Sequence, residues 1–188
     1  MDTIATRRRF TVREYERMIE AGILAEDDRV ELIEGDILTM VPIGPRHAAC
    51  VRRLNALLMA SPVKDQFVVS IQDPISLPGA ASEPQPDIAL LVPPLSRYTE
   101  RHAGARDTLL LIEVADTSAA DDRSRKLPLY ARAGISEVWL IDLANLAVEC
   151  YRSPSSAGYA DVRRFGQNDT ITPQALPQLA IRADQIIG

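Results

Sequence analysis

The chain has 188 residues, of which 46% are hydrophobic, and it carries a formal net charge of −5 at pH 7. These values predict one folded domain with a sizeable core, and the acidic balance argues against extensive nonspecific binding to nucleic acid. Because the chain has no apolar run near the ~18 residues of a membrane helix, no signal-peptide core and only two isolated cysteines, Cys50 and Cys150, we expect a soluble, cytoplasmic protein that does not engage a membrane and holds no disulfide framework.

The chain begins with a polar segment that contains Arg7-Arg8-Arg9. We expect residues 1–9 to be a flexible N-terminal arm and residues 10–188 to form a single domain. The three arginines suit either contact with phosphate or a solvated, disordered start of the chain.

The first half of the chain predicts two helices, a hairpin and one or two further strands. In order, these are a helix over residues 11–21, a hairpin over 30–40 with its turn at 34–36, a long helix over 45–60, one or two strands over 66–77 that break at 73–74, and a turn-rich segment over 79–85.

The second half alternates strand and helix. In order, we expect a polar connection over residues 93–107, a strand over 109–114, a helix over 124–133, a strand over 137–142, and three short antiparallel strands over 148–151, 160–165 and 170–172 that extend the sheet edge. A strand, a helix and a strand in succession favour a parallel, right-handed crossover. The predicted fold class is α/β, a mixed sheet flanked by helices.

Two acids lie at the ends of apolar strand runs. Asp87 follows Pro86 and opens one run, and Glu113 closes another. A carboxylate in such surroundings is costly unless a cation compensates it, and two of them ~4 Å apart would repel by about 4 kcal/mol at an effective dielectric of about 20. A divalent cation removes that cost, and carboxylate oxygens suit Mg²⁺. The alternative interpretation is an acid in a turn and an unrelated acid at a strand end.

Lys126 is one of only two lysines among 21 basic residues, the other being Lys64. In a chain this rich in arginine, a lysine suggests a need for a compact ammonium, although a solvated helix residue is the alternative. Pro128 restricts the helix that carries it, which either starts near Ser124 or is kinked at the proline.

Together, these features resemble the PD-(D/E)XK nuclease superfamily and, within it, the Uma2 family of restriction-endonuclease-like proteins. The resemblance covers residues 10–151. Its pieces are Phe10-Thr11-Val12 with Tyr15, the segment 29–37, Met40 with Pro42 and His47, Pro86-Asp87, Glu113-Val114-Ala115, Asp122-Arg123 with Lys126, Tyr130, Ala133-Gly134, and the segment 137–142. In the superfamily the lysine follows the acid by two residues. Ala115 holds that position here, so Lys126 is the candidate.

The resemblance implies a restriction-endonuclease-like sheet and a set of site residues. Asp87 and Glu113 would bind Mg²⁺ or Mn²⁺ with help from the backbone carbonyl of Val114, and Lys126 would serve the chemistry. Glu31 would approach as a third carboxylate, the alternative being an exposed position on a hairpin. His47 would contact the substrate phosphate or take part in proton transfer, the alternative being a structural role.

The predicted function is that of a metal-dependent endonuclease, which hydrolyses phosphodiester bonds, with DNA as the expected substrate. We also expect a homodimer, because an open sheet edge needs covering and cleavage of both strands of a duplex suits two-fold symmetry. The alternative is a catalytically silent interaction module that keeps the nuclease fold. No G-x-S-x-G, Walker or dinucleotide-binding motif supports an esterase, a nucleotide hydrolase or an oxidoreductase.

Overall fold

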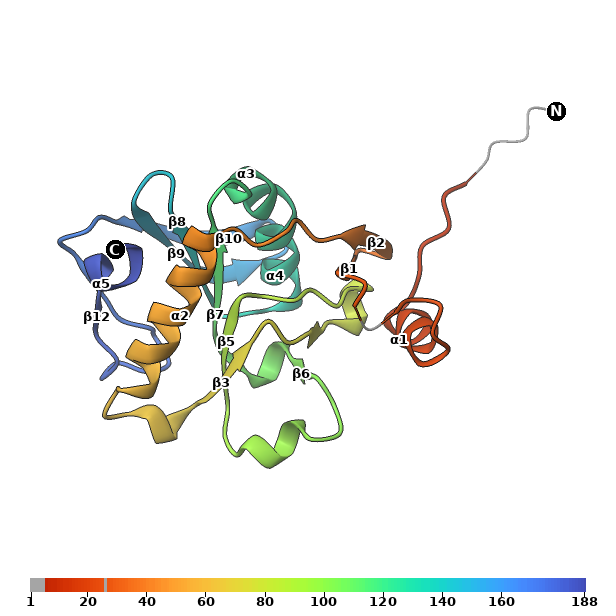
Figure 1. Cartoon of the computed structure of the whole chain (residues 1–188), viewed down its shortest axis with the longest axis horizontal. Helices are drawn as coiled ribbons and strands as arrows, with labels where there is room; N and C mark the ends of the chain where they lie inside the picture. Colours follow the sequence, from red (N-terminus) through yellow and green to blue (C-terminus); the bar gives the residue numbers. More distant parts are fainter. Residues whose placement is uncertain (1–5, 26) are drawn as a thin grey trace.

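The computed structural model describes residues 6–25 and 27–188, so the first five residues of the predicted N-terminal arm lie outside the described part of the chain. A six-stranded sheet of order β10-β9-β8-β7-β5-β3 forms its centre (Figure 1). The β7–β8 pair is parallel and the other neighbouring pairs are antiparallel. The predicted mixed α/β sheet, with its parallel crossover, is therefore confirmed.

The strands are β1 (Val30–Ile33), β2 (Asp36–Thr39), β3 (Val68–Ile71), β4 (Ile75–Ser76), β5 (Ile88–Leu91), β6 (Ala103–Gly104), β7 (Thr108–Ala115), β8 (Glu137–Asp142), β9 (Ala147–Ser155), β10 (Gly158–Phe165), β11 (Thr170–Ile171) and β12 (Ile181–Arg182). The helices are α1 (Val12–Glu20), α2 (Pro45–Met59), α3 (Ala119–Asp121), α4 (Leu127–Ala133) and α5 (Ala183–Ile187), with a π-helical turn η5 (Asp122–Lys126) between α3 and α4. Short 3₁₀ turns are η1 (Lys64–Gln66), η2 (Pro78–Ala80), η3 (Leu95–Tyr98) and η4 (Ala105–Asp107).

Local chemistry explains the N-terminal elements. Helix α1 begins at a capping box, in which the Glu14 N–H donates to the Thr11 hydroxyl at 3.2 Å and the Thr11 N–H donates to the Glu14 carboxylate at 3.0 Å. The predicted hairpin is β1–β2, and its turn residues Glu34 and Gly35 have φ of 50° and 83°. Two consecutive positive φ values are what a tight two-residue hairpin turn requires.

Alternation along the central strands divides the core into two layers. Ile112 and Val114 pack with α2 and α5, whereas Leu111 and Ala115 pack with α4. Helices α2 and α5 accordingly lie on one side of the sheet and α4 on the other (Figure 1). Because side chains alternate between faces, Glu113 points toward α4.

Two sequence predictions need correction. Residues 170–172 do not extend the main sheet. Instead, β11 pairs with β12 in a separate two-stranded sheet, because Ile171 and Ile181 are buried in the layer that contains α2. The strands over 148–151 and 160–165 do extend the main sheet, as β9 and β10. The helix expected to start near Ser124 begins earlier, at Ala119, and reaches Pro128 through η5.

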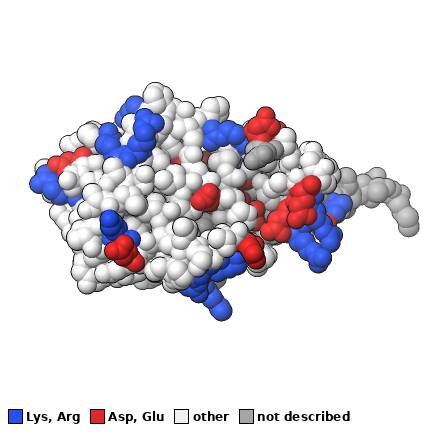
Figure 2. All heavy atoms as spheres, turned by 60° about the horizontal axis from the view of Figure 1, so that its bottom comes forward, with Lys and Arg blue, Asp and Glu red and all other residues white. Residues whose placement is uncertain are grey.

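The surface carries its charges in small groups. On the face seen in Figure 2, basic and acidic residues of the described chain alternate, with wide uncharged areas between them and no continuous basic band. Among the described residues, no helix combines the length and the apolarity that a transmembrane span requires.

Candidate active site

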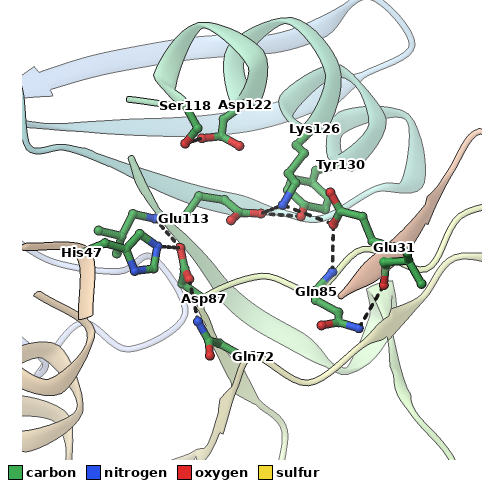
Figure 3. Close-up of polar contacts among 12 residues, drawn as sticks. Glu31, His47, Gln72, Gln85, Asp87, Glu113, Ser118, Asp122, Lys126 and Tyr130 are labelled. Carbon is green, nitrogen blue, oxygen red and sulfur yellow. Dashed lines mark hydrogen bonds and ion pairs between the residues drawn. The ribbon is translucent and has the colours of Figure 1, made fainter. Parts of the chain in front are cut away.

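Strand register brings the two predicted acids together. Ile88 of β5 pairs with Ile112 of β7 in an antiparallel ladder, so the next pair along is Asp87 with Glu113. Directly opposed residues share a face of the sheet. Figure 3 shows the Glu113 carboxylate turned toward Lys126 and the Asp87 carboxylate turned toward His47 and Gln72. Asp87 directly precedes β5 and Glu113 lies on the adjacent β7; that the two carboxylates share one ion stays a prediction.

Asp87 is 8% exposed and is held by three neighbours. The Val114 N–H donates to its Oδ2 at 2.8 Å, the Gln72 side-chain amide donates to its Oδ1 at 3.3 Å, and His47 Nε2 lies 3.0 Å from Oδ2. These contacts fix the orientation of the carboxylate before any ligand arrives. Gln72, which sits just beyond β3 at φ 55°, has no sequence signal that would have marked it.

Val114 meets the strand extension that precedes β5. The Val114 N–H points toward Asp87. In a strand, the N–H and the C=O of one residue point toward the same neighbouring strand, so the Val114 carbonyl also points toward the segment that carries Asp87. The next residue in register, opposite Val114, is Pro86. Because proline has no N–H, it offers the Val114 carbonyl no ladder donor. That carbonyl is available as a further oxygen beside the two carboxylates.

Glu113 is only 4% exposed. The Tyr130 hydroxyl donates to its Oε1 at 2.6 Å, and Lys126 Nζ lies 3.5 Å away. Burial raises the pKa of Glu113 to about 8; Lys126 opposes this shift, and Asp87 adds to it. The site therefore disfavours the negative charge on Glu113 unless more positive charge is supplied.

Lys126 joins the acids from the helix that follows β7. Its Nζ lies 3.3 Å from Glu31 Oε2 as well as 3.5 Å from Glu113 Oε1, and its side chain is 12% exposed. Burial acts against the ammonium, but Glu113 and Glu31 outweigh it and raise the pKa of Lys126. The interpretation of Lys126 as a solvated helix residue is wrong. Glu31 is 8% exposed, so the interpretation of it as an exposed hairpin position is wrong too.

The π-helical turn η5 places a fourth acid at the same site. Its last hydrogen bond runs from the Leu127 N–H to the Asp122 carbonyl, one residue longer than in an α-helix, directly before Pro128. Asp122 is 6% exposed and accepts a hydrogen bond from the Ser118 hydroxyl at 2.8 Å. Burial raises the pKa of Asp122. The sequence motif contained Asp122, but sequence reasoning gave it no role in the site.

His47 lies in the first turn of α2 and contacts Asp87 through Nε2. Its other ring nitrogen, Nδ1, is buried and has no hydrogen-bond partner among the described residues. The structure thus joins His47 to the candidate metal ligand. Contact of His47 with a substrate phosphate stays a prediction.

Carboxylates predominate among the charged groups of the site. Four buried carboxylates, those of Glu31, Asp87, Glu113 and Asp122, face one ammonium. Within residues 6–25 and 27–188, no group of three or more acid, histidine or cysteine side chains is arranged to hold a metal ion. The two opposed carboxylates and the Val114 carbonyl are hard oxygens, the kind of donor that Mg²⁺ prefers.

These residues lie in a recess of about 600 Å³. One wall is the connection over residues 40–44 between β2 and α2, and the other is the segment from Asp116 to Lys126. The acids form its inner surface, as in the close-up of Figure 3.

Comparisons with known proteins identify the family of the chain and a solved structure with the same fold. A family model described as "Uma2: Putative restriction endonuclease" matches residues 12–184. A crystal structure from Anabaena variabilis ATCC 29413, described as "a putative nuclease belonging to DUF820", superposes with a TM-score of 0.73 over 95% of this chain and 97% of that one. At 16% identity, the latter similarity shows a shared fold. No curated protein matches the chain.

Proposed function

The chain belongs to the Uma2 family, and from that premise we propose that it is a metal-dependent endonuclease that hydrolyses phosphodiester bonds in DNA. The observation that carries the proposal is the pairing of Asp87 with Glu113 across β5 and β7, beside a buried lysine. An excess of buried carboxylates without a bound cation has no structural benefit, because each costs free energy on burial.

Asp87, Glu113 and the Val114 carbonyl would hold Mg²⁺ or Mn²⁺. When bound, the ion supplies Lewis-acid polarisation of the scissile phosphate and lowers the pKa of water at the site. The residues of the chain prepare the ligands. His47, Gln72 and the Val114 N–H orient Asp87, and the Tyr130 hydroxyl orients Glu113.

Lys126 would act on the reacting groups. Its ammonium stays protonated, since Glu113 and Glu31 raise its pKa. From that position it stabilises the negative charge that develops on the phosphate oxygens and orients the attacking water. Glu31 also binds the ammonium, at 3.3 Å, so the position of Lys126 is set by two carboxylates and not by Glu113 alone.

The second candidate function is an interaction module that keeps the fold without cleaving. The net charge of −5 favours it, because an acidic protein is repelled by the phosphate backbone. Cation binding and substrate turnover distinguish the two functions. A nuclease must bind a divalent cation and turn over a substrate.

The test incubates the protein with linear, supercoiled and branched DNA in Mg²⁺ and in Mn²⁺, beside Asp87→Ala. Mn²⁺ binding is measured in parallel by calorimetry on the wild type, on Asp87→Asn, and on Asp161→Asn as a control on β10. We expect cleavage and Mn²⁺ binding in the wild type and the control, and loss of both when Asp87 is changed. An inert wild type that binds no Mn²⁺ would establish the interaction module instead.

We also propose a homodimer that acts in the cytoplasm. The strands β3 and β10 are the two edges of the main sheet, and an uncovered edge invites pairing with another chain. The free thiols of Cys50 and Cys150 suit a reducing compartment. Light scattering on the eluting protein at micromolar concentration would give twice the 20.7 kDa chain mass, and a monomer would refute the dimer.

A further inference from the structure

We propose that the recess above Asp87 and Glu113 accepts single-stranded DNA and excludes the intact duplex. The recess, defined by the residues 40–44 on one wall and 116–126 on the other, admits one strand whose nucleotides enter individually. This inference rests on the proposed nuclease function and names the substrate class of that same site.

The first argument for a single strand is that Asp87 and Glu113 lie deep in the recess. Asp87 is 8% exposed and Glu113 is 4% exposed. An ion held by both would bind a substrate oxygen at only about 2.1 Å. The scissile phosphate must therefore enter the recess rather than touch its rim.

The size of the recess is the second step. At about 600 Å³ it falls within the range of pockets that enclose one small molecule, and it suits a nucleotide or two. Duplex DNA is a stiff rod with a persistence length of about 150 base pairs, so its phosphates cannot fold into a cavity of this kind. A single strand can splay its nucleotides outward, which is how proteins read unpaired loops and ends.

The apolar wall is the third step. Val41 is 71% exposed at the lip of the recess, beside Pro42 and Ile43. Nothing in the fold requires an exposed apolar side chain at this point. The unpaired bases of a single strand present apolar faces that such a wall can cover, whereas the bases of a duplex hide those faces by stacking.

The charge of the recess is the fourth step. Six acids line it, against three cationic residues, Arg29, Arg125 and Lys126. Arg125 is already paired with Asp121 at 2.8 Å, and at the rim Arg46 is paired with Asp116 at 2.8 Å. Duplex DNA carries one negative charge per ~1.7 Å of axis and needs an extended basic surface. The lining of the recess, in which acids outnumber cations, does not supply such a surface, so a substrate that brings few phosphates fits better.

The test compares one fluorescein-labelled 20-nucleotide strand with its blunt duplex and with the same duplex carrying a single-stranded tail. Binding is measured by fluorescence anisotropy in Ca²⁺, and cleavage in Mn²⁺. We expect the strand and the tail to be cut at least tenfold faster than the blunt duplex, and to bind more tightly. Equal cleavage of strand and duplex would overturn the inference and leave the nuclease standing.

The remaining outcomes separate the two proposals. Tight binding of the strand without cleavage would support the recess assignment and refute the nuclease. Neither binding nor cleavage of any DNA would overturn both. Thermal unfolding of the same preparation, followed by circular dichroism, shows that the protein tested is folded.

A pair of variants tests the wall directly. Val41→Asp places a charge where the bases would lie, and it should weaken strand binding by about tenfold. Val162→Asp is the matched control, since Val162 is 53% exposed on β10, on a strand that does not line the recess. Both variants should melt like the wild type. Equal binding by Val41→Asp and the control would refute the contact with this wall.

Discussion

Two clusters of buried acids on this sheet have opposite electrostatics. The active-site cluster is Glu31, Asp87, Glu113 and Asp122 with Lys126. The edge cluster, toward the β10 edge of the sheet, is Asp142 and Glu149 with Arg123; at the other end of β8, on the opposite face of the sheet, Glu137 pairs with Arg152. All seven acids are 9% exposed or less. The active-site cluster has four carboxylates for one cation, whereas the edge cluster has two for the Arg123 guanidinium, and Glu137 has the Arg152 guanidinium.

In the edge cluster, partners outweigh burial. Burial alone would raise the pKa of Asp142, but hydrogen bonds from Asn145 and Arg123 hold it below its usual value. Glu149 behaves in the same way, through Arg123 and the Tyr151 hydroxyl. In the active-site cluster burial prevails, since the pKa of Glu113 rises to about 8 despite Lys126. A buried acid therefore marks a ligand site only where the protein leaves its charge uncompensated.

The largest expected effect is on catalysis, through Glu113→Gln. Cleavage should fall by about 10³-fold or more, because a metal ligand is lost. The free energy of unfolding should stay the same or rise, since a costly buried charge disappears. Single-turnover experiments measure the cleavage rate, and urea unfolding measures the free energy of unfolding. The control is Glu149→Gln, which should keep cleavage and lose stability; a destabilised Glu113→Gln would contradict the contrast between the clusters.

Lys126→Met should reduce cleavage by about 10²–10³-fold, the size expected for one preorganised electrostatic contact. The metal-free protein should also be less stable, because Glu113 and Glu31 lose their cation. Mn²⁺ should then stabilise the variant more than the wild type in thermal melts. Lys126→Arg should be impaired as well, since a planar guanidinium replaces a compact charge. Full activity in Lys126→Met would show that the lysine has no part in the chemistry.

Arg152→Met tests the Glu137–Arg152 pair, another buried acid with its own cation. Arg152 donates to Glu137 Oε1 at 2.7 Å, and the Glu137 side chain is 1% exposed. Removal of one partner from a buried pair typically costs about 3 kcal/mol. Urea unfolding should show this loss, while calorimetry should show unchanged Mn²⁺ binding. Weaker Mn²⁺ binding would mean that this pair is coupled to the active-site cluster.

Glu83 gives the smallest effect and the clearest pH dependence. It is 2% exposed, its Oε2 has no partner within the described chain, and burial raises its pKa from 4.5 to about 7, with a further contribution from Glu16. Between those two values the folded state binds more protons than the unfolded state, so stability falls as the pH rises and levels off above about 7.

Glu83→Gln should remove this dependence. We expect it to gain on the order of 2 kcal/mol over the wild type at pH 8 and nothing at pH 4. Urea unfolding at pH 4, 6 and 8 measures it, with Glu20→Gln, an exposed acid on α1, as the control. A gain of equal size at all three pH values would show that something other than the charge of Glu83 is responsible.

The sequence by itself determined α1, α2, the strands of the main sheet and the two central acids. Periodicity located α1, α2 and the strands, because apolar spacing is a local property that follows directly from the 3.6-residue and two-residue repeats. Asp87 and Glu113 were identifiable because each interrupts an apolar run. Glu31 and His47 came from the family resemblance, and Lys126 came from the scarcity of lysine in the chain together with that resemblance. Metal binding, the substrate and the dimer stay predictions.

Only the tertiary structure decided how the site is held. Lys126 meets Glu31 from 95 positions further along the chain, and Gln72 reaches Asp87 from the neighbouring strand. Such contacts depend on strand order and register, which local patterns do not encode. The position of Asp122 depends on the π-helical turn before Pro128, and the sequence showed only that a proline must disturb that helix. Whether a buried acid is compensated is likewise settled by distant partners, and that compensation is what separates the site from the edge cluster.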